Sequence, residues 1–503
     1  MGKKVVFKTY QQHQMSLLPP SLDELISEKH PVRVVNAIID QIELSALEKS
    51  YLGGGTSSYH PRMLLKVLVY AYLNNVYSSR AMERQLQENI HYMWLSGMSK
   101  PDHNTINRFR SERLSKSLEI IFTQVVALMV EQGLVDLKQV YTDGTKLEAN
   151  ANKYTFIWGK SIARNKERIA QQLTELWAYT QRVANQELEE PEPPDFDPVD
   201  PVKVKKTLER INEALRSSPQ SDQKKVQKAR YGLKHWPANL EKYQQQEVLM
   251  GSRNSMSKTD PDATFMRMKE DHMKNGQLKP GYNLQISTQQ QYILCYSLHQ
   301  DRSDSKTLPQ HLDKFKQLHG KLPEDLTADA GYGSVDNYVR LEKENINAYV
   351  KYSGFDKEQN GKINPYHSSN FQYIPDQDIY ICPEGKPMHN MGTINENGRI
   401  IKQYQAQECQ QCPVRDTCYK AQSPNRIIRV DNLFRAYTQK AAELLRSEQG
   451  IKHRKRRCID VEPTFANLKH NKKFKRVSLR GIKKVEIEIG LLALAHNLKK
   501  WAA

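Results

Sequence analysis

The sequence predicts a mixed α/β domain that follows an all-α N-terminal domain and is interrupted by a helical insertion and a Cys-rich insertion. Three observations predict it: helical apolar spacing in the first quarter of the chain, short β-like runs further on, and two segments of different composition between those runs. At 503 residues the chain is also too long for one ordinary core. The predicted domains are a helical domain over residues 1–135, an α/β domain from residues 136–157, 251–353 and 451–503, a helical insertion over residues 158–250, and a Cys-rich insertion over residues 354–450.

The N-terminal domain is predicted to consist of short helices. Pro61 begins PRMLLKVLVYAYL, whose leucines recur on one helical face, and SSRAMERQLQEN follows with Ser78 or Ser79 as its N-cap. Asp102 is expected to cap the polar helix DHNTINRFRSERL. Its side chains suit base edges and phosphates, which favours a helix-turn-helix-like DNA-binding domain; an ordinary helical domain with a charged surface is the alternative. The candidate DNA-contacting residues are Asn104, Asn107, Arg108 and Arg110.

The α/β domain is predicted from five short runs of strand-forming residues with one helical segment among them. The helical segment, KTLPQHLDKFKQLHG, lies between the third and fourth runs. Strands followed by a helix and further strands are typical of a mixed sheet covered by helices. The five runs are KQVYTDGTKL (138–147), GYNLQIST (281–288), QYILCYSLH (291–299), EDLTADAGYGS (324–334) and NINAYVKYS (345–353).

The helical insertion shows a seven-residue repeat of apolar side chains, which predicts a helical hairpin or a short coiled coil. Its central stretch, LEEPEPPDFDPVDPVK, is rich in Pro and acidic residues and is expected to be an exposed linker. The repeat is formed by Ile162, Ile169, Leu176 and Val183.

The charge of the chain predicts a polyanionic partner. The formal net charge is +18, and the segment Ile451–Ala503 holds 15 Lys and Arg against 4 Asp and Glu, a net +11. Neutralised phosphates release counterions, so we expect DNA rather than a membrane or an acidic protein. No apolar run approaches the about 20 residues that span a bilayer. The N-terminus lacks a signal-peptide pattern, so we expect a cytoplasmic, nucleoid-associated protein.

Three acidic residues occur in contexts that favour metal binding. Asp143 lies within a predicted strand before Gly144, and Asp329 ends another strand before Ala-Gly-Tyr-Gly. Small neighbours leave a crevice that a bulky substrate can approach. Glu462 lies in the most basic segment, with Lys469 two helical turns beyond it on the same face. Taken singly, such acids are more often turn, cap or surface residues; together they form a hard-oxygen set suited to Mg²⁺ or Mn²⁺.

Two further acids, Asp301 and Asp304, follow the third predicted strand. We expect them to cap the next helix. The alternative is that they contact the metal-binding residues without contacting the metal themselves.

The local motifs and their order resemble the bacterial insertion-sequence DDE transposases over nearly the whole chain. TDGTKLEANAN, ADAGYGS and VEPTFANLKHN resemble that family's three catalytic blocks, and RGIKKVEIEIGLLALAHNLKK resembles its closing helix. SYHPRMLLKVLVYAYL, SSRAMERQLQEN and PDHNTINRFR resemble its helical DNA-binding region. The resemblance implies an RNase H-like catalytic domain. It assigns the catalytic, metal-binding acids to Asp143, Asp329 and Glu462, and the family's lysine to Lys469.

The resemblance further implies that two Mg²⁺ or Mn²⁺ ions support cleavage of DNA at terminal inverted repeats and strand transfer into target DNA by a homodimer. Relatives often carry an Arg and a Tyr where this chain has Cys458 and Lys455, and Arg457 can substitute for the Arg. Two alternatives stay open: an inactive or domesticated DNA-binding relative, and a nuclease that cuts without joining. The residues expected to contact phosphates are Arg457, Lys469, Lys473, Arg476 and Arg480.

Four of the six cysteines cluster in the Cys-rich insertion. A C-x2-C pair with further cysteines nearby can enclose a structural Zn²⁺. An iron–sulfur cluster and unligated thiols are the alternatives, because the outer spacings are irregular. The candidate ligands are Cys382, Cys409, Cys412 and Cys418.

Overall fold

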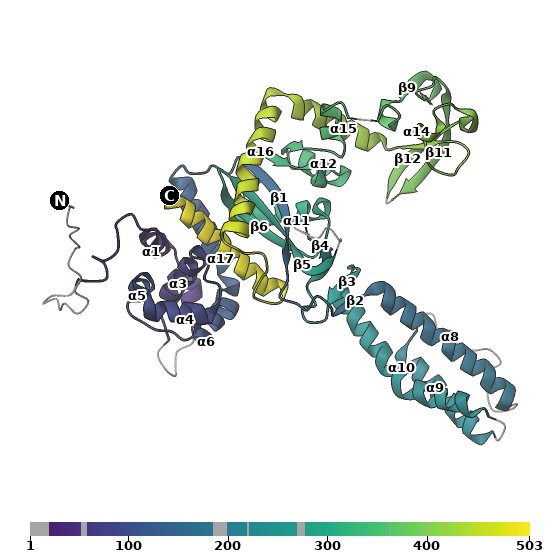
Figure 1. Cartoon of the computed structure of the whole chain (residues 1–503), viewed down its shortest axis with the longest axis horizontal. Coiled ribbons are helices and arrows are strands. Elements are labelled where there is room, and N and C mark those ends of the chain that lie inside the picture. The colour runs from purple at the N-terminus through teal and green to yellow at the C-terminus, as the bar shows by residue number, and fades with distance from the viewer. Residues whose placement is uncertain are drawn as a thin grey trace, which may run out of the picture. The chain divides into compact units, whose positions relative to one another are not determined.

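The computed structural model (Figure 1) describes residues 20–51, 58–184, 199–218, 221–268, 277–362, 364–396 and 398–503. These residues divide into two compact units: one comprises those up to Gln132 together with Ile487–Ala503, and the other comprises those from Gly133 to Glu486. No helix in the described part of the chain is long and apolar enough to cross a membrane.

The larger unit is built on a mixed sheet, as the sequence predicts. In the described residues its strand order is β4-β5-β1-β7-β8, with β6 paired to β5. β1 runs antiparallel to β5 and parallel to β7, and β7 runs parallel to β8. The strands are β1 (Gln139–Glu148), β4 (Thr264–Arg267), β5 (Leu278–Gln289), β6 (Tyr292–His299), β7 (Asp325–Ala328) and β8 (Asn347–Val350).

The register of β1 decides which side chains face each layer of helices. Asp143 pairs with Ile286 and Gly144 pairs with Gln285. Because side chains alternate along a strand, Asp143 and Gly144 project from opposite faces of the sheet. The helix α11 (Asp304–His319) packs on the face of Gly144, and α16 (Glu448–Ala466) packs on the face of Asp143 (Figure 1).

Short elements complete this part of the unit. They are η3 (Ala330–Tyr332), α12 (Val335–Lys343), α13 (Phe355–Gln359), α15 (Asn432–Arg446) and η7 (Asn467–Asn471).

The smaller unit is helical. Thr105 N donates to Asp102 Oδ1 over 2.8 Å, so Asp102 caps its helix as expected. Ser78 is the N-cap residue of α4, without a side-chain hydrogen bond. The helices are α1 (Pro31–Gln41), α2 (Ser45–Glu48), α3 (Pro61–Leu73), α4 (Ser79–Glu88), α5 (Ile90–Ser96), α6 (His103–Arg108), η1 (Phe109–Arg113), η2 (Leu114–Lys116) and α7 (Leu118–Glu131).

The C-terminal helix α17 (Ile482–Trp501) differs from the predicted domain boundary. Its residues from Ile487 onward belong to the helical unit, whereas the sequence analysis assigned them to the α/β domain. Burial raises the pKa of Tyr72 of α3, and the buried Glu488 carboxylate of α17 raises it further.

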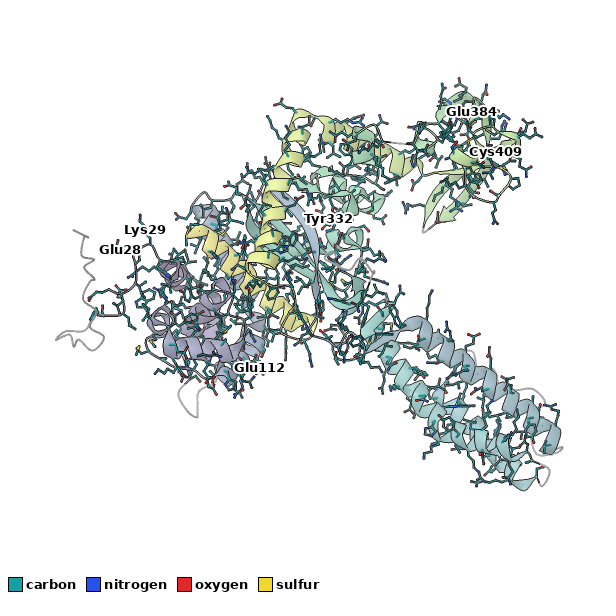
Figure 2. All side chains as sticks on the ribbon, in the orientation of Figure 1. Glu28, Lys29, Glu112, Tyr332, Glu384 and Cys409 are labelled. Atoms are coloured by element: carbon teal, nitrogen blue, oxygen red, sulfur yellow. The ribbon has the colours of Figure 1, made fainter. Side chains whose placement is uncertain are left out.

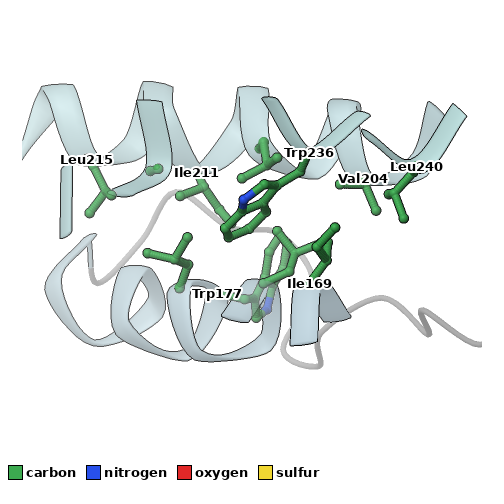
Figure 3. Close-up of a cluster of buried hydrophobic side chains, with 11 residues drawn as sticks. Ile169, Trp177, Val204, Ile211, Leu215, Trp236 and Leu240 are labelled. Atoms are coloured by element: carbon green, nitrogen blue, oxygen red, sulfur yellow. The ribbon is translucent and has the colours of Figure 1, made fainter. Parts of the chain in front are cut away.

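The helical insertion is a three-helix arm rather than a hairpin. Ile169 and Leu176 of the heptad repeat pack with Trp177 and Trp236 between the helices, as Figure 3 shows for the labelled residues. Ile162 instead joins a separate cluster with Met250 and Met256. Most of the Pro-rich linker lies outside the described residues. The arm comprises α8 (Gly159–Ala184), α9 (Pro201–Ser217) and α10 (Gln223–Met250), and β2 (Phe156–Trp158) pairs with β3 (Ser255–Ser257) beside it.

The Cys-rich insertion contains an antiparallel sheet that the sequence analysis did not predict. Its strand order is β13-β12-β11-β10-β9 over a small core that includes Tyr380, Met388 and Tyr404. This sheet and its short helices are called the Cys lobe below. Its elements are β9 (Gln372–Ile374), β10 (Ile379–Ile381), β11 (Pro387–Glu396), β12 (Arg399–Ala406), β13 (Ile427–Val430), η6 (Cys409–Gln411) and α14 (Arg415–Cys418).

Candidate active site

Two of the predicted acids lie side by side on neighbouring parallel strands. Tyr141 of β1 is level with Thr327 of β7, and continuing that register places Asp143 level with Asp329, just beyond the end of β7. Each carboxylate accepts a backbone hydrogen bond: Gly144 N donates to Asp143 Oδ1 (2.7 Å) and Gly331 N donates to Asp329 Oδ1 (2.8 Å). The two carboxylates are therefore held in place at one end of the strand pair.

The third acid comes from α16, which is fixed to the sheet by buried polar contacts. His453 Nδ1 lies 3.3 Å from the Tyr141 hydroxyl, and Asp460 Oδ1 accepts a 2.7 Å hydrogen bond from Thr288 Oγ1. Burial lowers the pKa of His453, partly offset by Asp325. Glu462, two residues beyond Asp460, keeps an exposed side chain on this anchored helix.

Arg457 of α16 joins the three predicted acids into one cluster. Its Nη2 lies 2.8 Å from Asp143 Oδ2 and 3.8 Å from Asp329 Oδ2, and its Nη1 lies 3.6 Å from Glu462 Oε1. The Arg457 side chain is 12% exposed. The structure thus brings Asp143, Asp329 and Glu462, called the acid cluster below, together around the half-buried guanidinium of Arg457.

The acid cluster fits a divalent cation by its donor chemistry. Carboxylate oxygens are the ligands that Mg²⁺ and Mn²⁺ prefer. The positively charged guanidinium of Arg457 lies among these oxygens, at a position that favours a cation. One guanidinium leaves three carboxylates with an excess of negative charge. Among the described residues no three Asp, Glu, His or Cys side chains stand close enough together to hold one ion. In this cluster the guanidinium of Arg457 contacts all three acids instead.

A second set of polar residues approaches the same place from the α11 face. Asp304 Oδ1 accepts hydrogen bonds from Asn283 Nδ2 (2.8 Å) and Gln285 Nε2 (3.1 Å). Tyr332, fully buried in the interior of this unit (Figure 2), donates its hydroxyl hydrogen to Gln285 Oε1. The predicted capping role of Asp304 is wrong, because Ser303 is the N-cap residue and the Asp304 carboxylate bonds to β5.

The predicted DNA-contacting residues of α6 and η1 divide into two groups. Asn104, Asn107 and Arg108 are exposed. Arg110 is 4% exposed, and its Nη1 donates to Tyr77 O (2.7 Å) and Tyr72 Oη (3.3 Å). The prediction that Arg110 contacts DNA is wrong. Its buried guanidinium instead stabilises the turn after α3 within the helical unit by these hydrogen bonds.

The basic C-terminal residues divide in the same way. Lys473, Arg476 and Arg480 are exposed, and Arg480 Nε donates to Asn150 O (2.8 Å). Lys469, also predicted to contact phosphates, is only 7% exposed. Lys469 lies in the π-helical turn η7 (Asn467–Asn471), seven residues beyond Glu462.

The predicted cysteine ligands line one small cavity of about 30 Å³ in the Cys lobe, where Figure 2 labels Cys409. Lys386 N donates to Cys382 Sγ (3.4 Å), and Arg426 Nη1 lies 2.9 Å from Cys418 Sγ. Cys409 and Cys412 complete the group.

Sequence reasoning missed two features of the site. It assigned Arg457 to DNA phosphates, although the side chain lies among the acids. It also gave Asn283 and Gln285 no role. The available signal was their alternation with Ser287 on one face of a strand, since three polar residues in a row are unusual beneath a helix.

Comparison with known protein families gives two matches. Residues 381–502 match the family model described as Transposase DDE domain, and residues 20–112 match the model described as Transposase domain (DUF772). The first match contains Arg457 and Glu462 and begins after Asp143 and Asp329. No curated protein matches the chain.

Proposed function

Its family matches and its fold identify the chain as an insertion-sequence DDE transposase, and from this premise we propose that it cuts and joins DNA at the acid cluster. Its substrates are the terminal inverted repeats of its own element and a target duplex. The observation that carries the proposal is the meeting of Asp143, Asp329 and Glu462 around Arg457, although they come from three distant segments of the chain.

The acids are proposed to bind the catalytic cations. Two divalent ions held there would activate a water and stabilise the leaving 3′ oxygen. In cleavage, water oxygen bonds to phosphorus, the P–O3′ bond breaks, and the 3′ oxygen leaves as a hydroxyl. In joining, that 3′-OH attacks a target phosphorus, and the target strand's own 3′ oxygen leaves with a proton. Asp143 and Asp329 are pre-positioned for this role by their backbone hydrogen bonds.

Exposed basic and amide side chains are proposed to hold the DNA. Arg108 with Asn104 and Asn107 offers donors on one short helix. Lys473 and Arg476 offer exposed cations that follow the helix of Glu462. Because each element end needs one active site, the active form is proposed to be a homodimer on DNA.

A strand-transfer assay tests the proposal. The full chain is incubated with Mg²⁺ or Mn²⁺, a labelled element-end duplex that carries a free 3′-OH, and a supercoiled target plasmid. Joined product is expected with the 3′-OH donor and not with a 3′-dideoxy donor or one of scrambled sequence. Cleavage without joining would identify a nuclease instead, and binding without either reaction would identify a DNA-binding relative that has lost catalysis.

A further inference from the structure

Asp304 is a carboxylate that the DDE assignment leaves unused, yet it lies beside the acid cluster. It is the first residue of α11 and directs its side chain toward β5 and β1. Its Oδ1 is held by Asn283 and Gln285. For its Oδ2 the described residues provide no hydrogen-bond donor, so one carboxylate oxygen is fixed and the other remains available to a ligand.

Two glycines open the space between Asp304 and the acid cluster. A Cβ atom at Gly144 would lie 2.9 Å from Asp304 Oδ1 and would also collide with Gln285. A Cβ atom at Gly331 would lie 3.0 Å from Asp329 Oδ1 and 3.6 Å from Asp304 Oδ2. Gly144 follows Asp143 directly, and Gly331 is two residues beyond Asp329. The absence of side chains at both positions therefore lets Asp304 approach the metal-binding acids from the opposite face of the sheet.

Tyr332 provides an independent sign that these carboxylates share one site. Burial raises the pKa of its hydroxyl well above the usual value, and Asp143, Asp304 and Asp329 raise it further. The hydroxyl donates to Gln285 Oε1, which turns the amide nitrogen of Gln285 toward Asp304. Tyr332 and Gln285 thus orient the Asp304 carboxylate.

We propose that Asp304 is a fourth carboxylate ligand of the divalent-cation site, reaching it from the α11 face beside Gly144. The proposal rests on the proposed function, because it adds a ligand to the same site. Its carboxylate would take a coordination position that a water otherwise fills, because these ions keep several waters when few protein oxygens are in reach. The alternative is a purely structural role, in which Asp304 only accepts the hydrogen bonds of Asn283 and Gln285.

Metal binding by the full chain, measured without DNA and without reference to activity, separates the two roles. Asp304→Asn keeps an oxygen that can accept both hydrogen bonds and removes the negative charge. Asp329→Asn is the positive control, and Asp301→Asn makes the same charge change at an exposed position three residues away. Mn²⁺ affinity is measured by electron paramagnetic resonance, and the midpoint of thermal unfolding is measured in EDTA and in Mn²⁺.

Asp304→Asn is expected to weaken Mn²⁺ binding about tenfold or more and to shrink the Mn²⁺-induced rise in midpoint, as Asp329→Asn does. In EDTA its midpoint should equal or exceed that of the wild type, because a like charge has been removed from an acidic site. Asp301→Asn should behave as the wild type.

Two results would overturn the proposal, and they are distinguishable. If Asp304→Asn binds Mn²⁺ normally while Asp329→Asn does not, Asp304 is no ligand and the proposed function stands. A lower midpoint in EDTA alongside that normal binding would identify the structural role. If the wild type binds no Mn²⁺ at all, the metal site of the proposed function fails as well.

Discussion

At the scale of single residues, the chemistry of the site follows from which side chains the fold exposes and which it buries. Asp143, Asp329 and Glu462 were singled out by their resemblance to the DDE transposases, since each taken singly is more often a turn, cap or surface residue, and the structure brings the three together. The place of Arg457 could not be predicted. It lies five residues before Glu462, and only the docking of α16 on the sheet decides that its long side chain reaches Asp143.

Arg457→Gln tests the role of the guanidinium as the cation of the acid cluster. The substitution removes the 2.8 Å ion pair between Arg457 and buried Asp143, so in EDTA the free energy of unfolding should fall by about 3 kcal/mol. Mn²⁺ should raise the free energy of unfolding by more in the variant than in the wild type, because the cation replaces the missing positive charge. Urea unfolding in EDTA and in Mn²⁺ measures both effects. Lys455→Gln, at an exposed position of the same helix, is the control. Equal stability of Arg457→Gln and wild type in EDTA would contradict the assignment.

Arg108 and Arg110 form a matched pair for DNA binding, because one is exposed and the other buried. Arg108→Ala should leave the thermal midpoint unchanged, weaken binding to element-end DNA, and reduce the salt slope of binding by about one charge. Arg110→Ala should instead destabilise the helical unit by about 2 kcal/mol, because buried polar partners lose their donor. Thermal unfolding and fluorescence anisotropy across a salt series separate the two. Normal DNA affinity in Arg108→Ala would exclude α6 as a DNA contact.

At the scale of elements, the sequence predicts those whose pattern is set by one buried face. β1, β5, β6, β7 and β8 were all predicted, and so was α11. The strands of the Cys lobe were missed because β11 is exposed along most of its length, so apolar and polar residues do not alternate in it. The arm was predicted as helical but not as three helices. The heptad repeat in α8 shows that one face of the helix is apolar, but it does not fix how many other helices pack against that face.

The docking of α11 on the sheet predicts a pH dependence of stability. His311 lies between Ser287 Oγ (2.8 Å) and Ser297 Oγ (2.7 Å), and burial lowers its pKa from 6.5 to about 3. Unfolded chains take up the proton below pH 6.5 and folded chains do not, so stability is full above pH 6.5 and falls as the pH drops toward 3. This group contributes about 1.4 kcal/mol per pH unit in that window.

His311→Gln checks that dependence. Urea unfolding between about pH 7 and about pH 4.5 should show a slope smaller by about 1.4 kcal/mol per pH unit than that of the wild type. Other histidines with lowered pKa values, such as buried His299 and half-buried His319, contribute the same pH dependence in the variant and in the wild type. An unchanged slope would show that His311 is already protonated in the folded protein.

The Cys lobe is proposed to bind one structural Zn²⁺ through the cysteines of its cavity. Elemental analysis of the purified full chain should give one zinc per chain, and Cys412→Ser should lower that content. Removal of zinc by a chelator should lower the thermal midpoint, because metal binding stabilises the folded form. Iron with visible absorbance would point to an iron–sulfur cluster, and absence of both metals would leave four unligated thiols.

At the scale of the whole molecule, the chain brings one site together from three distant segments and places insertions between them. The order of motifs predicted this arrangement, because the strand order of a mixed sheet is the same whatever is inserted into its loops. The position of α17 could not be predicted. The helix is apolar on nearly every side, so its pattern identifies no single buried face, and its residues from Ile487 onward join the helical unit.

The most direct measurement of the central claim is metal-dependent cleavage of labelled element-end DNA by the wild type and by Asp143→Asn, Asp329→Asn and Glu462→Gln. Each variant should bind the DNA as the wild type does, because none is placed among the DNA contacts. Each should lose cleavage by a factor of about 10³ or more in Mg²⁺ and in Mn²⁺. A variant that cuts at the wild-type rate, or a wild type that binds the ends and never cuts, would contradict the assignment of the acid cluster as the active site.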